Sequence, residues 1–263
     1  MGLLKFVLLS LLFIACTANK EKEGEVVLNI YDIGKVKGLD PIMADDRYAG
    51  QETSRVYEGL LAFHYLKRPY VLEPALAESL PVVSEDGLTY TFTIKKGIFF
   101  QDSEAFPGGK GRELVAEDFV YSLKRLADAR NNSSGWWLLQ NKIKGLDEWR
   151  DKYSKAKDNA HYNELVEGMN APDKYTLKFI LKQKFPQFLY AFAMPFTFVV
   201  AHEVVDKYKD SFLNHPVGTG PYLLPEFKQT DKIVYKKNPK YRDNFYPTEG
   251  EPGDEEKGLL VDA

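Results

Sequence analysis

The sequence predicts a mixed α/β fold of the α+β kind, because its strands and helices follow one another in no regular order. Strict alternation of apolar and polar residues predicts half-buried strands at residues 88–95 and 175–181. Between them, residues 116–130 carry apolar side chains three and four residues apart, which is the spacing of one helix face. These three segments decide the fold class.

The other elements follow from shorter patterns. The pair Asp86-Gly87 predicts the turn that leads into the first of these strands. The very apolar segment 185–200 contains Pro186 and Pro195, so it predicts a buried helix and strand and not a membrane span. The remaining predictions are, in chain order, a strand, a polar loop, a helix and a last strand at residues 26–31, 44–51, 54–63 and 232–236.

The composition is that of an ordinary globular protein. The chain has 263 residues, of which 44% are hydrophobic and 28% charged, and this length allows one or two domains. Its formal net charge of -3 argues against a nucleic-acid partner, since chains that bind phosphates usually carry a basic excess. The sequence contains neither a P-loop nor a nucleophile elbow, and its four histidines are not spaced as metal ligands usually are. We expect no catalytic residues, no cofactor and no metal, and hence no enzyme.

The N-terminus predicts export from the cytoplasm. Lys5 precedes a short apolar run that ends at Ala15, so residues 1–15 are interpreted as a secretory signal. Cys16 is the only cysteine, and the residues before it resemble the lipobox of bacterial lipoproteins, which implies lipidation of Cys16. The alternative is that Cys16 ends a cleaved or buried segment. Residues 16–25 are polar and are interpreted as a flexible tether between lipid and domain.

Seven landmarks, taken in order, resemble the family of peptide-, dipeptide- and nickel-binding extracellular proteins of ABC importers. Three departures accompany the resemblance. The loop from Asp102 to Arg112 is longer than is usual in this family, Val115 stands where the family commonly has a capping threonine, and family members are about twice as long. The landmarks are Leu39–Pro41, Val56–Leu61, Pro74–Ser79, Ile94–Phe100, Ala116–Arg125, Ala171–Leu177 and Pro216–Tyr222.

The resemblance implies a type II clamshell of the periplasmic-binding-protein kind. Residues 26–45 and 172–263 are then an incomplete first lobe, residues 46–171 a small inserted domain, and the second lobe is missing. An extended peptide would be held between the lobes by main-chain hydrogen bonds and delivered to the permease subunits in the membrane. The expected location is extracytoplasmic, either in the periplasm or on the outer face of the cell membrane, with a lipid anchor. The chain by itself is expected to bind peptide weakly or not at all.

The resemblance also implies three groups of ligand-binding residues. The first group lies in the polar loop 44–51, the second is a tryptophan pair in a Ser/Gly-rich segment, and the third is a hinge-side turn. Each group has a structural alternative. The loop could be an ordinary exposed surface loop, the tryptophans could be buried in the core, and the glycines could simply permit a tight turn. The candidate residues are Asp45, Asp46, Arg47, Tyr48, Trp136, Trp137, Gly218, Thr219 and Gly220.

Two other interpretations stay open. A member of the same family could bind nickel, haem or an oligosaccharide in place of peptide, although few histidines lie near the expected cleft loops. The chain could also be a truncated or degenerate surface lipoprotein without transport activity. An exposed apolar patch at the expected lobe contact would favour truncation over that second role.

Overall fold

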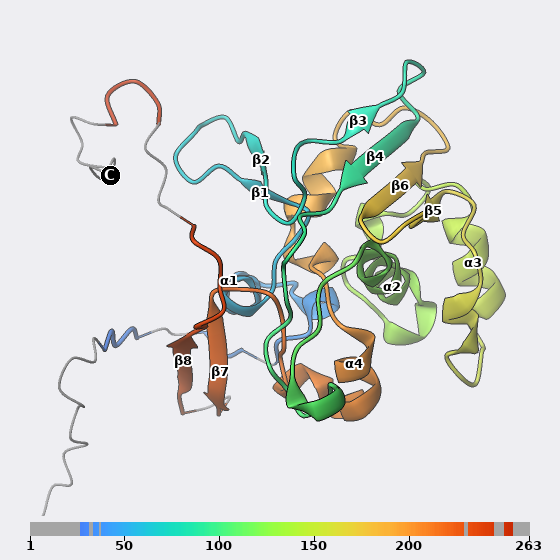
Figure 1. The fold of residues 1–263 in the computed structure, drawn as a ribbon. Helices are drawn as coiled ribbons and strands as arrows, with labels where there is room; N and C mark the ends of the chain where they lie inside the picture. Colours follow the sequence, from blue (N-terminus) through green and yellow to red (C-terminus); the bar gives the residue numbers. More distant parts are fainter. Residues whose placement is uncertain (1–26, 32–33, 37, 229–230, 245–249, 255–263) are drawn as a thin grey trace, which may run out of the picture. The chain divides into compact units, whose positions relative to one another are not determined.

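The computed structural model describes residues 27–31, 34–36, 38–228, 231–244 and 250–254 (Figure 1). The chain divides into two units, residues 1–33 and residues 34–263. In the first unit, residues 27–31 form neither a helix nor a strand. The predicted strand at 26–31 is therefore wrong over the described part, because an apolar run becomes a strand only where another strand pairs with it.

The described part of the second unit contains three antiparallel sheets. Two of them are hairpins, β1–β2 and β7–β8, and the third has the strand order β3-β4-β6-β5. The last hairpin contains the predicted strand at 232–236, which is confirmed as β8. The strands are β1 (Leu61–Phe63), β2 (Leu72–Pro74), β3 (Val82–Val83), β4 (Thr89–Thr93), β5 (Met169–Asn170), β6 (Thr176–Ile180), β7 (Tyr222–Phe227) and β8 (Ile233–Lys237).

The two alternating segments pair with each other at the centre of the four-stranded sheet. The β4 and β6 strands are antiparallel, with Thr89 opposite Ile180 and Thr93 opposite Thr176. The alternating apolar residues Tyr90 and Phe92 of β4 and Leu177 and Phe179 of β6 are buried, as a period of two requires. The predicted turn is also confirmed, since Gly87 has a φ of 68° and follows directly on Asp86. The prediction of both strands is therefore confirmed.

Four α-helices lie among the described residues, and α2 is the central one (Figure 1). It confirms the helix predicted at 116–130, except that it ends three residues earlier. Asp128 has an extended backbone, and its carboxylate accepts the N–H of Arg130 at 3.0 Å, which starts a separate 3-10 turn. The helices are α1 (Arg47–Val56), α2 (Ala116–Ala127), α3 (Leu146–Tyr153) and α4 (His202–Tyr208).

The helix predicted at 54–63 is wrong beyond its first turn. The α1 helix ends at Val56, and the chain then extends into β1. The close approach of Gly59 to another segment explains the break, because a Cβ on Gly59 would lie 2.5 Å from the carbonyl oxygen of Phe192. The apolar residues Val56 and Leu60 are both buried although the chain between them is not helical, so their helical spacing was not specific.

Most of the segment 185–200 is buried or half-buried, as predicted, but it folds into 3-10 turns and not into a helix and a strand. Phe192 packs edge-on against Phe92 of β4, with ring centres 5.4 Å apart. No helix of the described residues is long and apolar enough to cross a membrane. The 3-10 helices are η1 (Pro41–Met43), η2 (Pro107–Gly109), η3 (Ala129–Asn131), η4 (Trp136–Leu138), η5 (Ala160–Asn163), η6 (Phe188–Ala193), η7 (Pro195–Thr197) and η8 (Lys209–Asn214).

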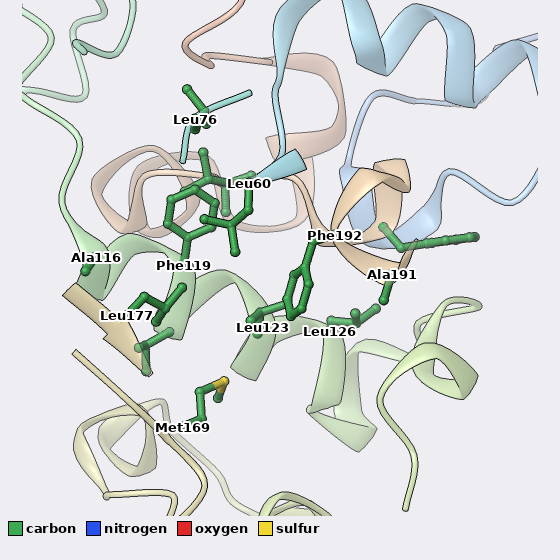
Figure 2. Close-up of a cluster of buried hydrophobic side chains, with 14 of the residues drawn as sticks. Leu60, Leu76, Ala116, Phe119, Leu123, Leu126, Met169, Leu177, Ala191 and Phe192 are labelled. Carbon is green, nitrogen blue, oxygen red and sulfur yellow. The ribbon is translucent and has the colours of Figure 1, made fainter. Parts of the chain in front are cut away.

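One core joins these elements. Figure 2 shows Phe119, Leu123 and Leu126 of α2 facing Leu177 of β6 and Phe192 of η6. The same sheet also crosses the expected domain boundary at residue 171, because β5 lies before that boundary and β6 lies after it. The predicted mixed fold is confirmed, whereas the division at residues 46 and 171 stays a prediction.

Candidate functional site

The first group of candidate residues lies at the start of α1. The carboxylate of Asp46 accepts the backbone N–H of Ala49 at 2.9 Å and caps the helix. The loop predicted at 44–51 is therefore wrong from Arg47 onward, because a polar stretch that follows a capping aspartate can form a solvated helix turn. Asp45 and Arg47 are exposed, and Tyr48 is half-buried.

The segment that carries the tryptophan pair lies beside this helix start. The hydroxyl of Ser133 donates to the carbonyl of Ile42 at 2.7 Å and accepts the N–H of Gly135 at 3.1 Å. Gly135 also lies against η7, where an added Cβ would be 2.5 Å from the ring of Phe196. The fold thus places the segment before the tryptophan pair against η1, which lies just before the segment Asp45–Tyr48, although the two bonded residues are 91 positions apart in the sequence.

The two tryptophans have different surroundings. Trp136 is half-buried, and the guanidinium of Arg150 lies 4.8 Å from the centre of its ring. Trp137 is 56% exposed, and its carbonyl accepts a hydrogen bond from the ammonium of Lys142 at 2.8 Å. Trp137 is the member of the pair whose ring is available to a ligand, while Trp136 packs against α3 through Arg150.

The third group lies at the opposite end of α1. Gly220 donates its N–H to the carbonyl of Val56 at 2.8 Å, and Gly218 approaches the same carbonyl so closely that a Cβ would lie 2.1 Å from it. The α1 helix has 10 residues and is therefore about 15 Å long. All three residues of the Gly218–Gly220 turn are buried, so this turn is not grouped with the other candidates.

Sequence reasoning missed two residues that build this region. Glu58 accepts the hydroxyl of Thr219 at 2.8 Å and so fixes the Gly218–Gly220 turn against the end of α1. Ser133 links η1 to the tryptophan segment, as described above. A signal existed for each, since Glu58 is the acidic residue in the Val56–Leu61 landmark and Ser133 belongs to the small polar run before the tryptophans.

The hollows described in this structure lie elsewhere. One of about 700 Å³ lies among α2, η5 and α4, and one of about 260 Å³ lies beside α3. Neither is lined by a candidate residue named above. The contact of residues 45–48 and of the tryptophan pair with a ligand therefore stays a prediction. Within the described ranges, no three His, Cys, Asp or Glu side chains gather as metal ligands would.

Charged side chains beside the larger hollow form ion pairs with one another. The guanidinium of Arg112 donates to Asp118 at 2.7 and 2.8 Å and to Glu203 at 2.5 and 2.9 Å. Burial alone would lower the pKa of Arg112, but the two carboxylates raise the pKa well above its usual range. Arg112 therefore ties α2 to α4, and this arrangement is structural.

The chain is similar in sequence to known solute-binding proteins. The sequence model described as bacterial extracellular solute-binding proteins, family 5 middle, matches residues 71–254. The glutathione-binding protein GsiB of Escherichia coli is 32% identical over 199 residues, which are 76% of this chain and 32% of that relative. The match thus spans about a third of the relative's length.

Solved structures show the same fold. The oligopeptide-binding protein OppAIV of Borrelia burgdorferi has a TM-score of 0.64 and 27% identity, covering 79% of this chain and 38% of its own. Listeria monocytogenes OppA bound to peptide has a TM-score of 0.63 and 25% identity, covering 78% of this chain and 37% of its own. The expected likeness to periplasmic-binding-type proteins is confirmed.

Proposed function

The chain belongs to family 5 of the bacterial extracellular solute-binding proteins, and on that premise we propose that it is part of the peptide-binding component of an ABC importer. The observation that carries the proposal is the family match over residues 71–254. Two similar proteins support the ligand class, since GsiB is a glutathione-binding protein and the OppA of Listeria monocytogenes was solved with a bound peptide. The whole protein's cargo and partners belong to this proposal.

The proposed mechanism is capture of an extended peptide through its main chain. Each backbone hydrogen bond contributes only about 0.5–1.5 kcal/mol net, so micromolar binding, which needs about -8 kcal/mol, requires several bonds and charge contacts together. Because these bonds do not read side chains, such a site accepts many sequences. One lobe alone supplies only part of the contacts, so we expect this chain to bind peptide weakly.

The residues proposed to face the peptide are those at the start of α1 together with Trp137. Asp45 and Arg47 are exposed and carry opposite charges, which suits the ammonium and the carboxylate of a short peptide. Trp137 offers an exposed flat ring to the peptide chain, and Ser133 holds its segment next to η1. The buried turn Gly218–Gly220 is proposed to act on the hinge side of the lobe.

The location of the protein is part of the same proposal. The family is described as extracellular, which supports an extracytoplasmic position. We propose that Cys16 carries the lipid and that residues 16–25 tether the lobe near the permease. Both segments lie outside the described residues, so the support for an anchor comes from the sequence alone.

The test is a titration followed by ¹H–¹⁵N NMR on this chain. Millimolar glutathione and trialanine are added in separate arms, with glucose at equal concentration as the control. We expect the peptides, and not glucose, to shift amide signals of residues 45–48 and 135–137. Shifts confined to other segments, or no shifts at about 10 mM peptide, would contradict the proposal and favour a degenerate surface lipoprotein.

The two peptide arms also separate ligand classes. Glutathione contains a γ-linked glutamate, whereas trialanine has only ordinary peptide bonds. A response to glutathione alone would restrict the ligand to that linkage, while equal responses would favour general backbone recognition. A third arm with Ni²⁺ tests the metal alternative. Calorimetry that gives a micromolar Kd for this chain would contradict the expected weakness of a single lobe.

A further inference from the structure

The carboxylate of Glu58 accepts hydrogen bonds from three residues that are distant from it in the sequence. It accepts the hydroxyl of Thr219 at 2.8 Å, the hydroxyl of Tyr241 at 3.1 Å, and two guanidinium N–H groups of Arg242 at 2.5 and 3.1 Å. Burial raises the pKa of Tyr241 to about 12, so its hydroxyl remains a donor at any ordinary pH. Glu58 follows Tyr57, the C-cap of α1, and lies in the stretch that leads into β1.

The backbone around this carboxylate is already fixed on one side. Gly220 donates to the carbonyl of Val56, and the side-chain amide of Asn238 donates to the carbonyl of Gly220 at 3.0 Å. Asn238 is buried, and its own N–H donates to Pro221 at 2.7 Å. The chain is therefore anchored to the end of α1 as far as Asn238.

Residues 239–244 have few other attachments to the rest of the fold. None of residues 239–244 is buried, and the N–H groups of Lys240 and Tyr241 bond only locally, to Asn238. Lys240 forms an ion pair with Asp102 at 2.6 Å, but the ammonium is half-exposed, and such pairs contribute little. The partly buried bonds to Glu58 are the main attachment of residues 241–242.

We propose that Glu58 is a positioning residue, a latch that holds residues 241–242 against the end of α1. The latch makes this segment move as one body with the lobe, so that any bending of the chain takes place after Arg242. It is a property of this chain whatever ligand is bound. Describing the latched segment as the hinge side of a clamshell rests on the proposed function.

Limited trypsin digestion of the ligand-free chain tests the latch. Trypsin must take the arginine side chain into its own pocket, so Arg242 bound to Glu58 is protected. In Glu58→Gln we expect cleavage after Arg242 to be about tenfold faster, because the segment opens more often when its charged partner is lost. Cleavage after Lys236 and Lys237 in β8 should keep its wild-type rate, and mass spectrometry assigns each cut.

Glu52→Gln is the matched control. Glu52 is buried to a similar degree and also accepts hydrogen bonds from a tyrosine and an arginine, Tyr235 and Arg55. We expect this variant to leave cleavage after Arg242 at the wild-type rate. Equal acceleration in both variants would mean general loosening and would overturn the latch, as would an unchanged rate in Glu58→Gln.

Two milder variants keep the test decisive if Glu58→Gln does not fold. Thr219→Val and Tyr241→Phe each remove one hydroxyl donor and leave the ion pair with Arg242 in place. Both should speed cleavage after Arg242 by a few-fold, and an unchanged rate in both would also overturn the latch. Because no ligand is used, this outcome is independent of the NMR titration, which can fail or succeed separately.

Discussion

The guanidinium of Arg125 in α2 donates two hydrogen bonds to the carboxylate of Asp40, at 2.9 and 3.2 Å. The side chains are only 8% and 14% exposed, so the pair lies in the interior of the protein. Burial alone would lower the pKa of Arg125, but Asp40 outweighs it and raises the pKa. Asp40 is also the capping residue of η1. This pair therefore connects the segment before the candidate site to the central helix.

Removal of this carboxylate should be among the most damaging single changes. In Asp40→Ala, Arg125 keeps its charge in a buried place without a partner, which costs about 3–5 kcal/mol of the unfolding free energy. Urea unfolding followed by circular dichroism measures the loss. The control is Glu167→Gln, which breaks the exposed pair with Lys144 and should change stability by less than about 0.5 kcal/mol. A loss below about 1 kcal/mol for Asp40→Ala would contradict the assigned role.

The start of α2 offers a stabilising change. The carboxylate of Asp118 already accepts the N–H of Val115 at 2.9 Å, but a valine side chain has no oxygen to return a bond. Val115→Thr would complete this capping box and increase the free energy of unfolding by about 1 kcal/mol. In a chain of this size, that increase raises Tm by about 2–4 °C. Differential scanning calorimetry checks the rise. Val115→Ala serves as the control and should not raise Tm.

Glu113 should account for part of the acid sensitivity of the fold. Its carboxylate accepts from Lys174 at 2.6 Å, from the N–H of Gly97 at 2.8 Å and from the hydroxyl of Tyr175 at 3.0 Å. These bonds, that of Lys174 first, lower the pKa of Glu113 from 4.5 to about 2. A lowered folded-state pKa means that stabilisation is present above about pH 4.5 and is lost as the pH falls toward about 2.

The corresponding experiment compares urea midpoints of wild type and Glu113→Gln between pH 6 and pH 2. The midpoint difference should be largest at pH 6 and shrink as the pH falls through this window. Added salt should reduce the difference as well, because the carboxylate is near solvent. A difference that is independent of pH would contradict the assignment to ionised Glu113.

Alanine substitutions of the two tryptophans should have different effects, one on ligand contact and the other on stability. Trp137→Ala should change the unfolding free energy by less than about 0.5 kcal/mol, since the ring is largely exposed, yet it should reduce the peptide-induced NMR shifts. Trp136→Ala removes the half-buried ring under Arg150 and should cost about 1–3 kcal/mol. If Trp137→Ala leaves the peptide response intact, the proposed role of this ring is wrong.

The lipid anchor can be tested in cells that process bacterial lipoproteins. Cys16→Ser should abolish incorporation of labelled palmitate and shift the chain from the membrane fraction to the soluble fraction. The result is unambiguous because the sequence contains no other cysteine. Thr17→Ala is the matched control and should keep the label. Label that persists in Cys16→Ser would rule out this anchor.

The family, the central strand pair and the central helix could all be predicted from the residues without a structure. The β4 and β6 strands could be predicted because one face of each is buried, so that apolar residues recur at every second position. The α2 helix was readable because Phe119, Leu123 and Leu126 must share one buried face. In these elements local pattern and tertiary burial demand the same conformation.

The conformations around the candidate site depend instead on contacts between distant segments. The end of α1 depends on Gly59 meeting Phe192, which is more than 100 residues away, and local spacing cannot report such a contact. The same holds for Ser133 beside Ile42 and for Glu58 with Arg242. Single hydrogen bonds between distant segments leave no periodic trace in the sequence, so the packed fold alone decides which side chains meet.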